Sequence, residues 1–210
     1  MNYPTFREDI LRLLGNIEHG TTRINTAVSN LKEFSRKKER EGWQRIHLRE
    51  VVEKGVAICA GELKKKVKSV DINLSEDLPM VVTDSGAVEQ ILVNLLINAI
   101  QAVDKEDSWI RVRAMLAPSR TDYVQIGVSD NGCGMDENTR ERIFEPFYTT
   151  KSPGTGTGLG LYVSQNLIYE LGGDILVESQ FGTGSTFTIQ LPIEQKREGA
   201  PIDSISRVLS

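Results

Sequence analysis

The stretch Gln90-Ile-Leu-Val-Asn94-Leu-Leu-Ile-Asn98-Ala-Ile-Gln101 lies in a segment that predicts one helix over residues 87–103. At 100° per residue its largest apolar side chains form one broad face, and four amide side chains form a narrow stripe opposite: Gln90, Asn94, Asn98 and Gln101. Isoleucines and a valine flank the stripe, so we expect this helix to be covered on most sides. Amides in such a place need hydrogen-bond partners, either from a neighbouring loop or from a ligand.

The segments around this helix predict an α+β fold. We expect two further helices, over residues 48–65 and 161–171, and a cap at Asp84 or Ser85 for the central helix, because a short polar side chain there accepts a bond from an unpaired amide. Strands are expected near residues 45–47, 70–74, 80–83, 109–116, 123–129, 174–179 and 185–191. Consecutive strands without intervening helices indicate a two-layer sandwich, in which a mixed sheet carries its helices on one face.

The start of the chain predicts a long helix of another kind. Between residues 5 and 40 there is no proline, and side chains recur at alternating spacings of four and three: Ile10, Leu14, Ile17, Thr21, Ile24, Val28, Leu31 and Ser35. Such a heptad seam needs a partner, so the helix either folds onto its own domain or forms one arm of an antiparallel hairpin in a dimeric bundle. We therefore expect a helix and charged linker in residues 1–42, one folded domain in residues 43–194 and a flexible tail in residues 195–210.

Composition and charge exclude several classes of protein. A hydrophobic content of 39% and a charged content of 26% are ordinary for a globular chain. The net charge of -4 offers no general attraction to nucleic acid, so we expect no nucleic-acid partner and infer that any anionic ligand is held locally. Cys59 and Cys133 form no paired motif, which favours a reducing compartment. No uncharged apolar run reaches the roughly 18 residues of a membrane span. These features predict a cytoplasmic chain and leave open a parent protein anchored in the membrane.

A first glycine-rich turn follows the strand expected at residues 123–129. It reads Asp130-Asn-Gly132-Cys-Gly134. A carboxylate at a strand end, with glycines two and four residues later, suits a turn where the backbone passes close to a flat ligand and the carboxylate accepts a bond from its amino group. The same letters also make an ordinary turn, so this segment alone does not decide the function.

A second glycine-rich segment reads Gly154-Thr-Gly156-Thr-Gly158-Leu-Gly160 and leads into the helix expected at residues 161–171. Alternating glycines before a helix start expose backbone N–H groups and the positive end of the helix dipole to phosphate oxygens. The spacing matches neither the dinucleotide-binding fingerprint nor the P-loop. The two commonest nucleotide-binding folds are therefore excluded.

Four segments in this order resemble the N, G1, F and G2 boxes of the sensor histidine kinases of two-component systems. They run from Gln90 to Ala99, from Asp130 to Met135, from Phe144 to Lys151 and from Gly156 to Leu161. The resemblance covers about residues 45–192, and residues 23–36 more loosely resemble the second helix of the family's dimerisation hairpin. It implies the Bergerat-type ATP-binding fold shared with gyrase-type and chaperone ATPases, with nucleotide between sheet and helices under a flexible lid.

The resemblance also implies a Mg²⁺·ATP site. Asn98 would coordinate Mg²⁺ through its amide oxygen, and Asn94 would contact phosphate or a metal-bound water. Asp130 would accept the adenine amino group, while Gly132 and Gly134 let the base approach. Thr186 would support the adenine end.

The phosphates would be held by the backbone amides of the G2 box, namely those of Gly156, Thr157, Gly158, Leu159, Gly160 and Leu161. Lys151 would add a cation from the lid. Gln101 belongs to the same set, although family members often carry a basic residue at its position. Phe144 and Phe147 are expected as hydrophobic anchors of the lid.

The implied activity is that of a protein-histidine kinase, which transfers the γ-phosphoryl group to a histidine on the first hairpin helix. Neither His19 nor His47 is followed by the acidic and Asn/Thr-Pro pattern of that acceptor. We therefore expect the acceptor helix to be absent from this chain and self-labelling to be negligible. The implied partners are that acceptor helix, the receiver domain of a response regulator and a second copy bound through the N-terminal helix.

Three other functions are compatible with the same pocket. One is a serine kinase of the anti-sigma type, another is a gyrase-like ATPase, and the third is a non-enzymatic module that senses nucleotide. The hairpin-type N-terminal helix and the Phe147-Tyr-Thr-Thr-Lys151 segment favour the sensor kinase.

Overall fold

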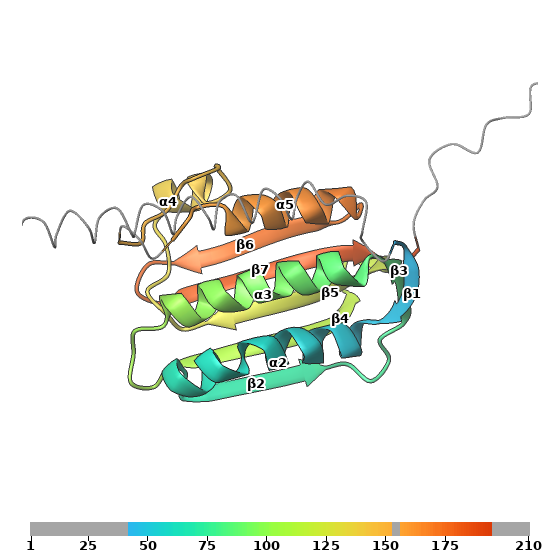
Figure 1. Cartoon of the computed structure of the whole chain (residues 1–210), viewed down its shortest axis with the longest axis horizontal. Helices are drawn as coiled ribbons and strands as arrows, with labels where there is room; N and C mark the ends of the chain where they lie inside the picture. The colour runs from blue at the N-terminus through green and yellow to red at the C-terminus, as the bar shows by residue number, and fades with distance from the viewer. Residues whose placement is uncertain (1–41, 153–155, 195–210) are drawn as a thin grey trace, which may run out of the picture.

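The computed structural model describes residues 42–152 and 156–194 (Figure 1). Its elements in chain order are β1 (Gln44–His47), α2 (Leu48–Lys66), β2 (Ser69–Leu74), β3 (Met80–Thr83), α3 (Ser85–Ala102), β4 (Trp109–Ala117), β5 (Arg120–Asp130), α4 (Glu137–Arg142), α5 (Gly160–Glu170), β6 (Asp174–Gln180) and β7 (Gly184–Pro192). The helix expected before residue 42 and the tail expected after residue 194 lie outside the described residues.

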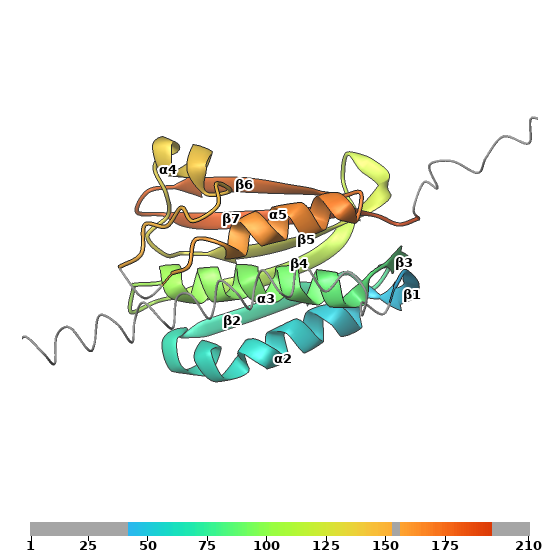
Figure 2. The same ribbon diagram turned by 45° about the horizontal axis from the view of Figure 1, so that its top comes forward.

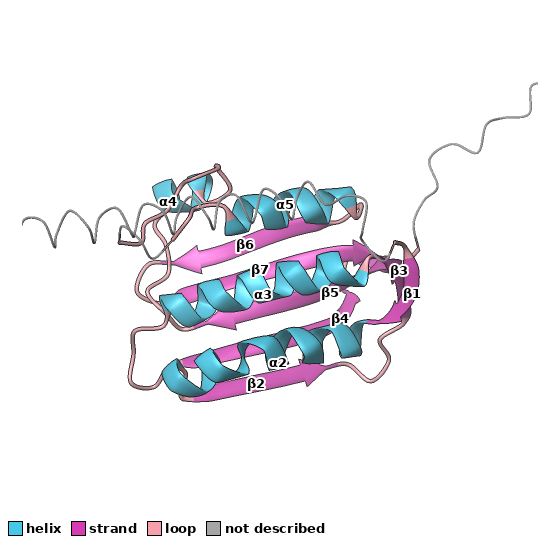
Figure 3. Ribbon diagram, viewed as in Figure 1, coloured by secondary structure: helices cyan, strands magenta, loops and turns pink. Residues whose placement is uncertain are grey.

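The main sheet has five strands in the order β2-β4-β5-β7-β6. The β2–β4 pair is parallel and the other pairs are antiparallel, so the sheet is mixed. Helices α2, α3 and α5 lie side by side on one face of it (Figures 1 and 2), and Figure 3 shows the two layers by element type. The expected two-layer α+β sandwich is confirmed. Among the described helices, none is long and apolar enough to cross a membrane.

The alternation of side chains along the strands decides which face the helices cover. In β5 the buried apolar residues are Val124, Ile126 and Val128, and the residues between them are less buried. Helix α3 is the centre of the helical layer, and its Ile91 and Leu95 are completely buried. Burying each such side chain contributes roughly 1.5–3 kcal/mol. The all-round apolar character of this helix therefore reflects contact with the sheet below and a helix on either side.

Contacts at the two ends of α3 fix the position of the amide stripe. The Asp84 carboxylate accepts a bond of 3.0 Å from the Ala87 N–H, so Asp84 and not Ser85 is the cap. Such a cap is worth about 1 kcal/mol. At the other end, the Ala102 carbonyl accepts a bond of 3.0 Å from the Cys133 N–H. This bond joins the end of α3 to the turn that follows β5.

Two features differ from the expectation. Strands β1 and β3 pair with each other in a separate two-stranded sheet, which is tied to the end of β7 by a 2.9 Å bond from the Val82 N–H to the Ile193 carbonyl. Helix α4 was not predicted, because none of its residues is buried and it carries no apolar period. Its sequence signal is the cap, since Asp136 accepts a 2.8 Å bond from the Thr139 N–H.

Candidate functional site

A cavity of about 540 Å³ lies between α3, the turn after β5 and the segment that leads into α5. Most of the candidate residues from the sequence line it together: Asn94, Asn98, Gln101, Asp130, Gly134, Lys151, Gly156, Thr157, Gly158, Gly160 and Leu161. The fold thus brings the four sequence segments to one place. Gly132, Leu159 and Thr186 do not line it.

Asp130 forms one end of the cavity. It is the last residue of β5, is only 5% exposed, and accepts a 2.8 Å bond from the Gly132 N–H. Burial raises the pKa of its carboxyl group, while backbone bonds from Gly132 and Ser185 and the charge of Lys105 act in the opposite direction. A buried acceptor in a cavity suits a ligand that presents an amino group.

The glycines of this turn allow close backbone approach, and each does so against a different element. A Cβ atom on Gly132 would lie 2.2 Å from the Ala102 carbonyl oxygen at the end of α3. Gly134 has a φ of +62°, and a Cβ there would lie 2.0 Å from the Gln180 carbonyl oxygen. Gly132 therefore packs the turn on α3 from outside the cavity, whereas Gly134 also lines it.

The start of α5 forms the other end of the cavity. No side chain caps this helix at Leu159, whose own side chain is buried. Gly160 and Leu161 line the cavity. The Asn94 amide of α3 donates 3.3 Å bonds to the Gly160 carbonyl and to the Ser164 hydroxyl. The positive end of the α5 dipole thus faces a cavity that has room for an anion.

Lys151 is the one cationic side chain among the described residues that line the cavity. Its Nζ donates a 3.0 Å bond to Asn98 Oδ1 and a second, short bond to Gln101 Oε1. Burial lowers the pKa of the Lys151 ammonium, and the nearby Cys133 opposes this shift. The amide stripe of α3 therefore presents oxygen atoms to a positive charge.

The amide oxygens of Asn98 and Gln101 indicate whether a divalent cation fits in this cavity. Amide oxygen is a ligand that Mg²⁺ accepts, and Asn98 Oδ1 already faces an ammonium ion, which shows that this atom is oriented toward a cation. The described residues contain no group of three or more His, Cys, Asp or Glu side chains suited to a metal. A Mg²⁺ ion at Asn98 would therefore take its remaining ligands from phosphate oxygens and water, and the donor set fits that arrangement.

A backbone hydrogen bond joins the two ends of the segment that follows α4. The Phe147 N–H donates a 2.9 Å bond to the Gly158 carbonyl, and Gly158 has a φ of +67°. Phe144 packs against the hydrophobic core, as expected for an anchor. The expectation for Phe147 is wrong, because its side chain is 69% exposed and its φ of 66° is unusual for a residue other than glycine.

The structure does not bring Thr186 to the cavity. In β7, Thr186 points to the open face of the sheet, where its hydroxyl donates a 2.9 Å bond to Ser129 Oγ. The preceding residue, Ser185, is buried, pairs with Asp130 in the sheet register and lines the cavity. Successive side chains of a strand point to opposite faces, so a shift of one residue exchanges the two roles.

Several lining residues were not candidates from the sequence. They are mostly apolar and form the walls of the cavity around the polar groups: Ile97, Met135, Ile143, Tyr148 and Phe187. Apolar walls with few polar groups are typical of pockets for ring-containing ligands. Ile97, Met135 and Tyr148 belong to the quoted segments, whereas Ile143 and Phe187 do not. The place of all five in the wall depends on how distant elements meet.

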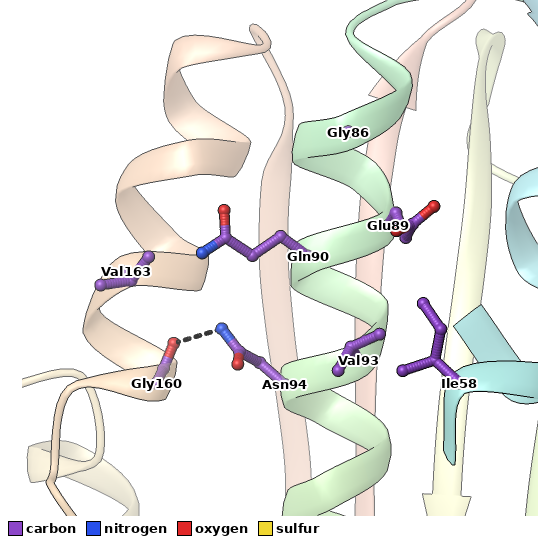
Figure 4. A pocket seen from close by; sticks show the side chains of 8 residues that line it. All are labelled: Ile58, Gly86, Glu89, Gln90, Val93, Asn94, Gly160 and Val163. Atoms are coloured by element: carbon purple, nitrogen blue, oxygen red, sulfur yellow. Dashed lines mark hydrogen bonds between the residues drawn. The ribbon is translucent and has the colours of Figure 1, made fainter. Parts of the chain in front are cut away.

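A second cavity of about 420 Å³ adjoins the first (Figure 4). It lies between α2, α3 and α5 and is lined by Ile58, Gly86, Glu89, Gln90, Val93, Asn94, Gly160 and Val163. Asn94 and Gly160 line both cavities, and the hydrogen bond between them forms the boundary. The second cavity extends from this boundary toward the start of α3.

Comparison with known proteins gives consistent matches. Residues 83–195 match the family model described as histidine kinase-, DNA gyrase B-, and HSP90-like ATPase. The chain is 37% identical over 171 residues to the signal transduction histidine-protein kinase AtoS of Escherichia coli strain K12, a match that covers 81% of this chain and 27% of AtoS. It is 35% identical over 176 residues to the sensor histidine kinase ZraS of Salmonella typhimurium, which covers 84% of this chain and 37% of ZraS. The chain thus spans well under half the length of these relatives.

The structure also resembles solved catalytic domains. A nucleotide-free structure of the catalytic domain of histidine kinase ThkA superposes with a TM-score of 0.61 at 29% sequence identity, covering 72% of this chain and 96% of that one. Full-length ShkA in complex with AMPPNP superposes with a TM-score of 0.69 at 23% identity over 89% of this chain and 38% of that one. The second likeness supports the fold alone.

Proposed function

Because this chain belongs to the histidine kinase-, DNA gyrase B- and HSP90-like ATPases and is the ATP-binding catalytic part of a sensor histidine kinase, we propose that it binds Mg²⁺·ATP in the larger cavity and transfers the γ-phosphoryl group to a histidine on a separate dimerisation helix. One observation carries this proposal. Three of the four stripe amides of α3, namely Asn94, Asn98 and Gln101, line a single cavity that also holds the buried carboxylate of Asp130 and the uncapped start of α5.

The two ends of the cavity set the direction of the nucleotide. The adenine amino group donates to Asp130, beside the end of α3 at Ala102. The triphosphate lies toward Asn94 and Gly160, where the α5 dipole and the backbone of Gly156 to Gly160 favour negative charge. Eight residues separate Ala102 from Asn94, which is about 12 Å along the helix axis. The nucleotide therefore lies lengthwise along α3.

The polar groups have distinct tasks in this arrangement. Asn98 would hold Mg²⁺ through Oδ1, and the ion would supply positive charge that neutralises the phosphates. Asn94 keeps its bonds to Gly160 and Ser164 and so fixes the start of α5 beside the phosphates. The backbone N–H of Ser185 donates to the Asp130 carboxylate and helps to hold it in place. In phosphoryl transfer the protein contributes mainly position and charge, and these residues supply both.

The second cavity is the side from which the acceptor approaches. The attacking and leaving atoms lie roughly in line through phosphorus, so the acceptor must come from beyond the γ-phosphate. That direction leads past Asn94 and Gly160 into the second cavity (Figure 4). From that side the lone pair of an imidazole nitrogen would form the new P–N bond, and the P–O bond to ADP would break with its electron pair on the β-phosphate oxygen. A receiver-domain aspartate of a response regulator takes the phosphoryl group next.

A transfer experiment tests this function. The 210-residue chain is incubated with γ-labelled ATP and MgCl₂, with and without the dimerisation and acceptor fragment of AtoS, a 37% identical relative. We expect acid-labile label on the histidine of that fragment and negligible label on His19 or His47. The Asn98→Ala variant serves as the control that lacks the proposed metal ligand.

Each alternative function gives its own result in the same assay. Acid-stable label on serine would support a serine kinase. Release of inorganic phosphate without protein label would support a gyrase-like ATPase. Saturable nucleotide binding with neither label nor hydrolysis would support a sensing module. Any of these results, or label on His19 or His47, contradicts transfer to a separate histidine.

A further inference from the structure

We propose that Lys151 is a built-in counter-cation that competes with Mg²⁺ for Asn98 Oδ1, and that Gln101 is the residue that positions it rather than a ligand of the nucleotide. This inference rests on the proposed function, because it concerns how the same cavity handles phosphate charge. It predicts that the chain binds ATP without a divalent cation through Lys151. It also predicts that Mg²⁺ raises the affinity for ATP by a smaller factor than it would in a chain without this lysine.

Lys151 bonds to two amide side chains of α3. Its Nζ is shared between Asn98 Oδ1 at 3.0 Å and Gln101 Oε1. The two amides are three residues apart on α3, so their side chains lie on one face of the helix about one turn apart. Together they form a two-oxygen site for one positive charge.

Thr149 and Gly156 lie against the backbone and the stem of Lys151. Its backbone N–H donates a 3.2 Å bond to Thr149 Oγ1. A Cβ atom on Gly156 would lie 2.6 Å from that same oxygen and 3.2 Å from Lys151 Cδ. The lysine stem therefore runs between Thr149 and the first described residue of the phosphate loop. Its ammonium group is fixed beside the place where the phosphates lie.

The charges of ATP, Lys151 and Mg²⁺ explain why the two cations compete. ATP carries several negative charges, and Lys151 is the one cationic side chain among the described residues that line the cavity. Asn98 Oδ1 cannot hold an ammonium ion and Mg²⁺ at full strength together, because the two positive charges repel each other at contact distance. With Mg²⁺ at Asn98, Lys151 would keep its bond to Gln101. Gln101 therefore prevents the lysine from leaving the cavity during the exchange.

The test measures AMP-PNP affinity by calorimetry, once with 5 mM MgCl₂ as roughly a saturating concentration and once with EDTA. The quantity of interest is the ratio of Kd in EDTA to Kd in Mg²⁺. We expect Lys151→Met to raise this ratio about tenfold or more, because a charge-assisted bond is worth a factor of roughly ten or above. Gln101→Ala should raise the ratio in the same direction by less. The double variant should match Lys151→Met alone, since Gln101 acts through the lysine.

Matched controls remove the same groups elsewhere. Lys65→Met deletes an exposed lysine of α2 that pairs with Glu62, and Gln125→Ala deletes an amide on the open face of the sheet. Neither should change the ratio, and Lys151→Arg should keep it near the native value because the charge remains. An unchanged ratio in Lys151→Met, or additive effects in the double variant, would overturn the inference. Absence of saturable binding by the native chain under both conditions would instead overturn the proposed function.

Discussion

At the scale of single residues, Asp130 links the stability of the fold to its ligand. Burial raises the pKa of this carboxyl group above its unfolded value. A raised pKa in the folded state stabilises the fold fully below the unfolded pKa of about 3.9, and this contribution is lost as pH rises through the folded pKa. At neutral pH the buried charge therefore costs stability, and under the proposed function the amino group of the ligand would offset this cost.

We predict that Asp130→Asn stabilises the protein at pH 7.5 and weakens nucleotide binding. The asparagine oxygen keeps the bond from the Gly132 N–H, so its NH₂ group faces the adenine amino group and donor meets donor. Loss of a charged acceptor corresponds to about 10- to 100-fold in Kd. Thermal melts should show a higher melting temperature than the native chain at pH 7.5 and a shrinking difference toward pH 4. A variant that is less stable at pH 7.5, or that binds AMP-PNP as tightly as the native chain, contradicts this assignment.

The sequence predicted which kinds of residue line the cavity better than it predicted the directions in which their side chains point. Asn94, Asn98 and Asp130 were chosen from the sequence, and the structure brings all three to one cavity. Ser185 was missed because the resemblance identified the strand and not its register, and one step along a strand moves a side chain to the other face. Lys151 was predicted from its segment, but its bonds to Asn98 and Gln101 depend on a contact across 50 residues that no local pattern shows.

At the scale of elements, the site depends on how the turn after β5 docks on the end of α3. The Cys133 N–H bonds to the Ala102 carbonyl, and Gly132 approaches so closely that no side chain fits between the two segments. This contact places Asp130 at the end of the amide stripe. The docking of one turn therefore sets the length of the cavity.

We predict that Gly132→Ala disrupts this docking. The new Cβ atom would lie 2.2 Å from the Ala102 carbonyl oxygen, so the backbone must move, at a cost of about 1–3 kcal/mol in unfolding free energy. Nucleotide affinity should fall as well, since Asp130 moves with the turn. Urea unfolding and AMP-PNP titration measure the two effects.

Gly61→Ala is the matched control for this substitution. Gly61 lies within α2, and a Cβ atom there would meet nothing within 4 Å. Alanine in an exposed helical position should raise stability by about 0.5–1 kcal/mol and leave nucleotide affinity unchanged. Equal stability losses in both variants would show that the docking contact has no special role.

Elements with a strong local signal were predicted and those set by tertiary contacts were not. Helix α3 followed from its apolar surround and cap, and the single covered face of the sheet followed from strand order. Helix α4 has no buried face and so no apolar period. The separate pairing of β1 with β3 depends on where β7 ends, since Val82 bonds to Ile193, and nothing within either strand encodes that.

At the scale of the whole molecule, a chain with a net charge of -4 holds an anionic ligand by local means. The larger cavity combines the start of α5, the glycine-rich backbone and the charge of Lys151. The second cavity continues in the same direction between α2, α3 and α5 (Figure 4). We therefore propose one track along α3, with base, phosphates and acceptor side in order.

Paramagnetic broadening of amide NMR signals by Mn²⁺·AMP-PNP tests this order most directly, because Mn²⁺ accepts the same oxygen ligands as Mg²⁺. The account predicts the strongest broadening at the Asn98 side-chain amide and at the backbone amides of Gly156 to Gly160. Broadening should be weaker at Asp130 to Gly134 and weakest at Gln125 and Thr188, which do not line the larger cavity. Strongest broadening at Asp130 to Gly134, or broadening centred outside the larger cavity, would contradict the central claim that the nucleotide lies along α3 with its phosphates at the start of α5.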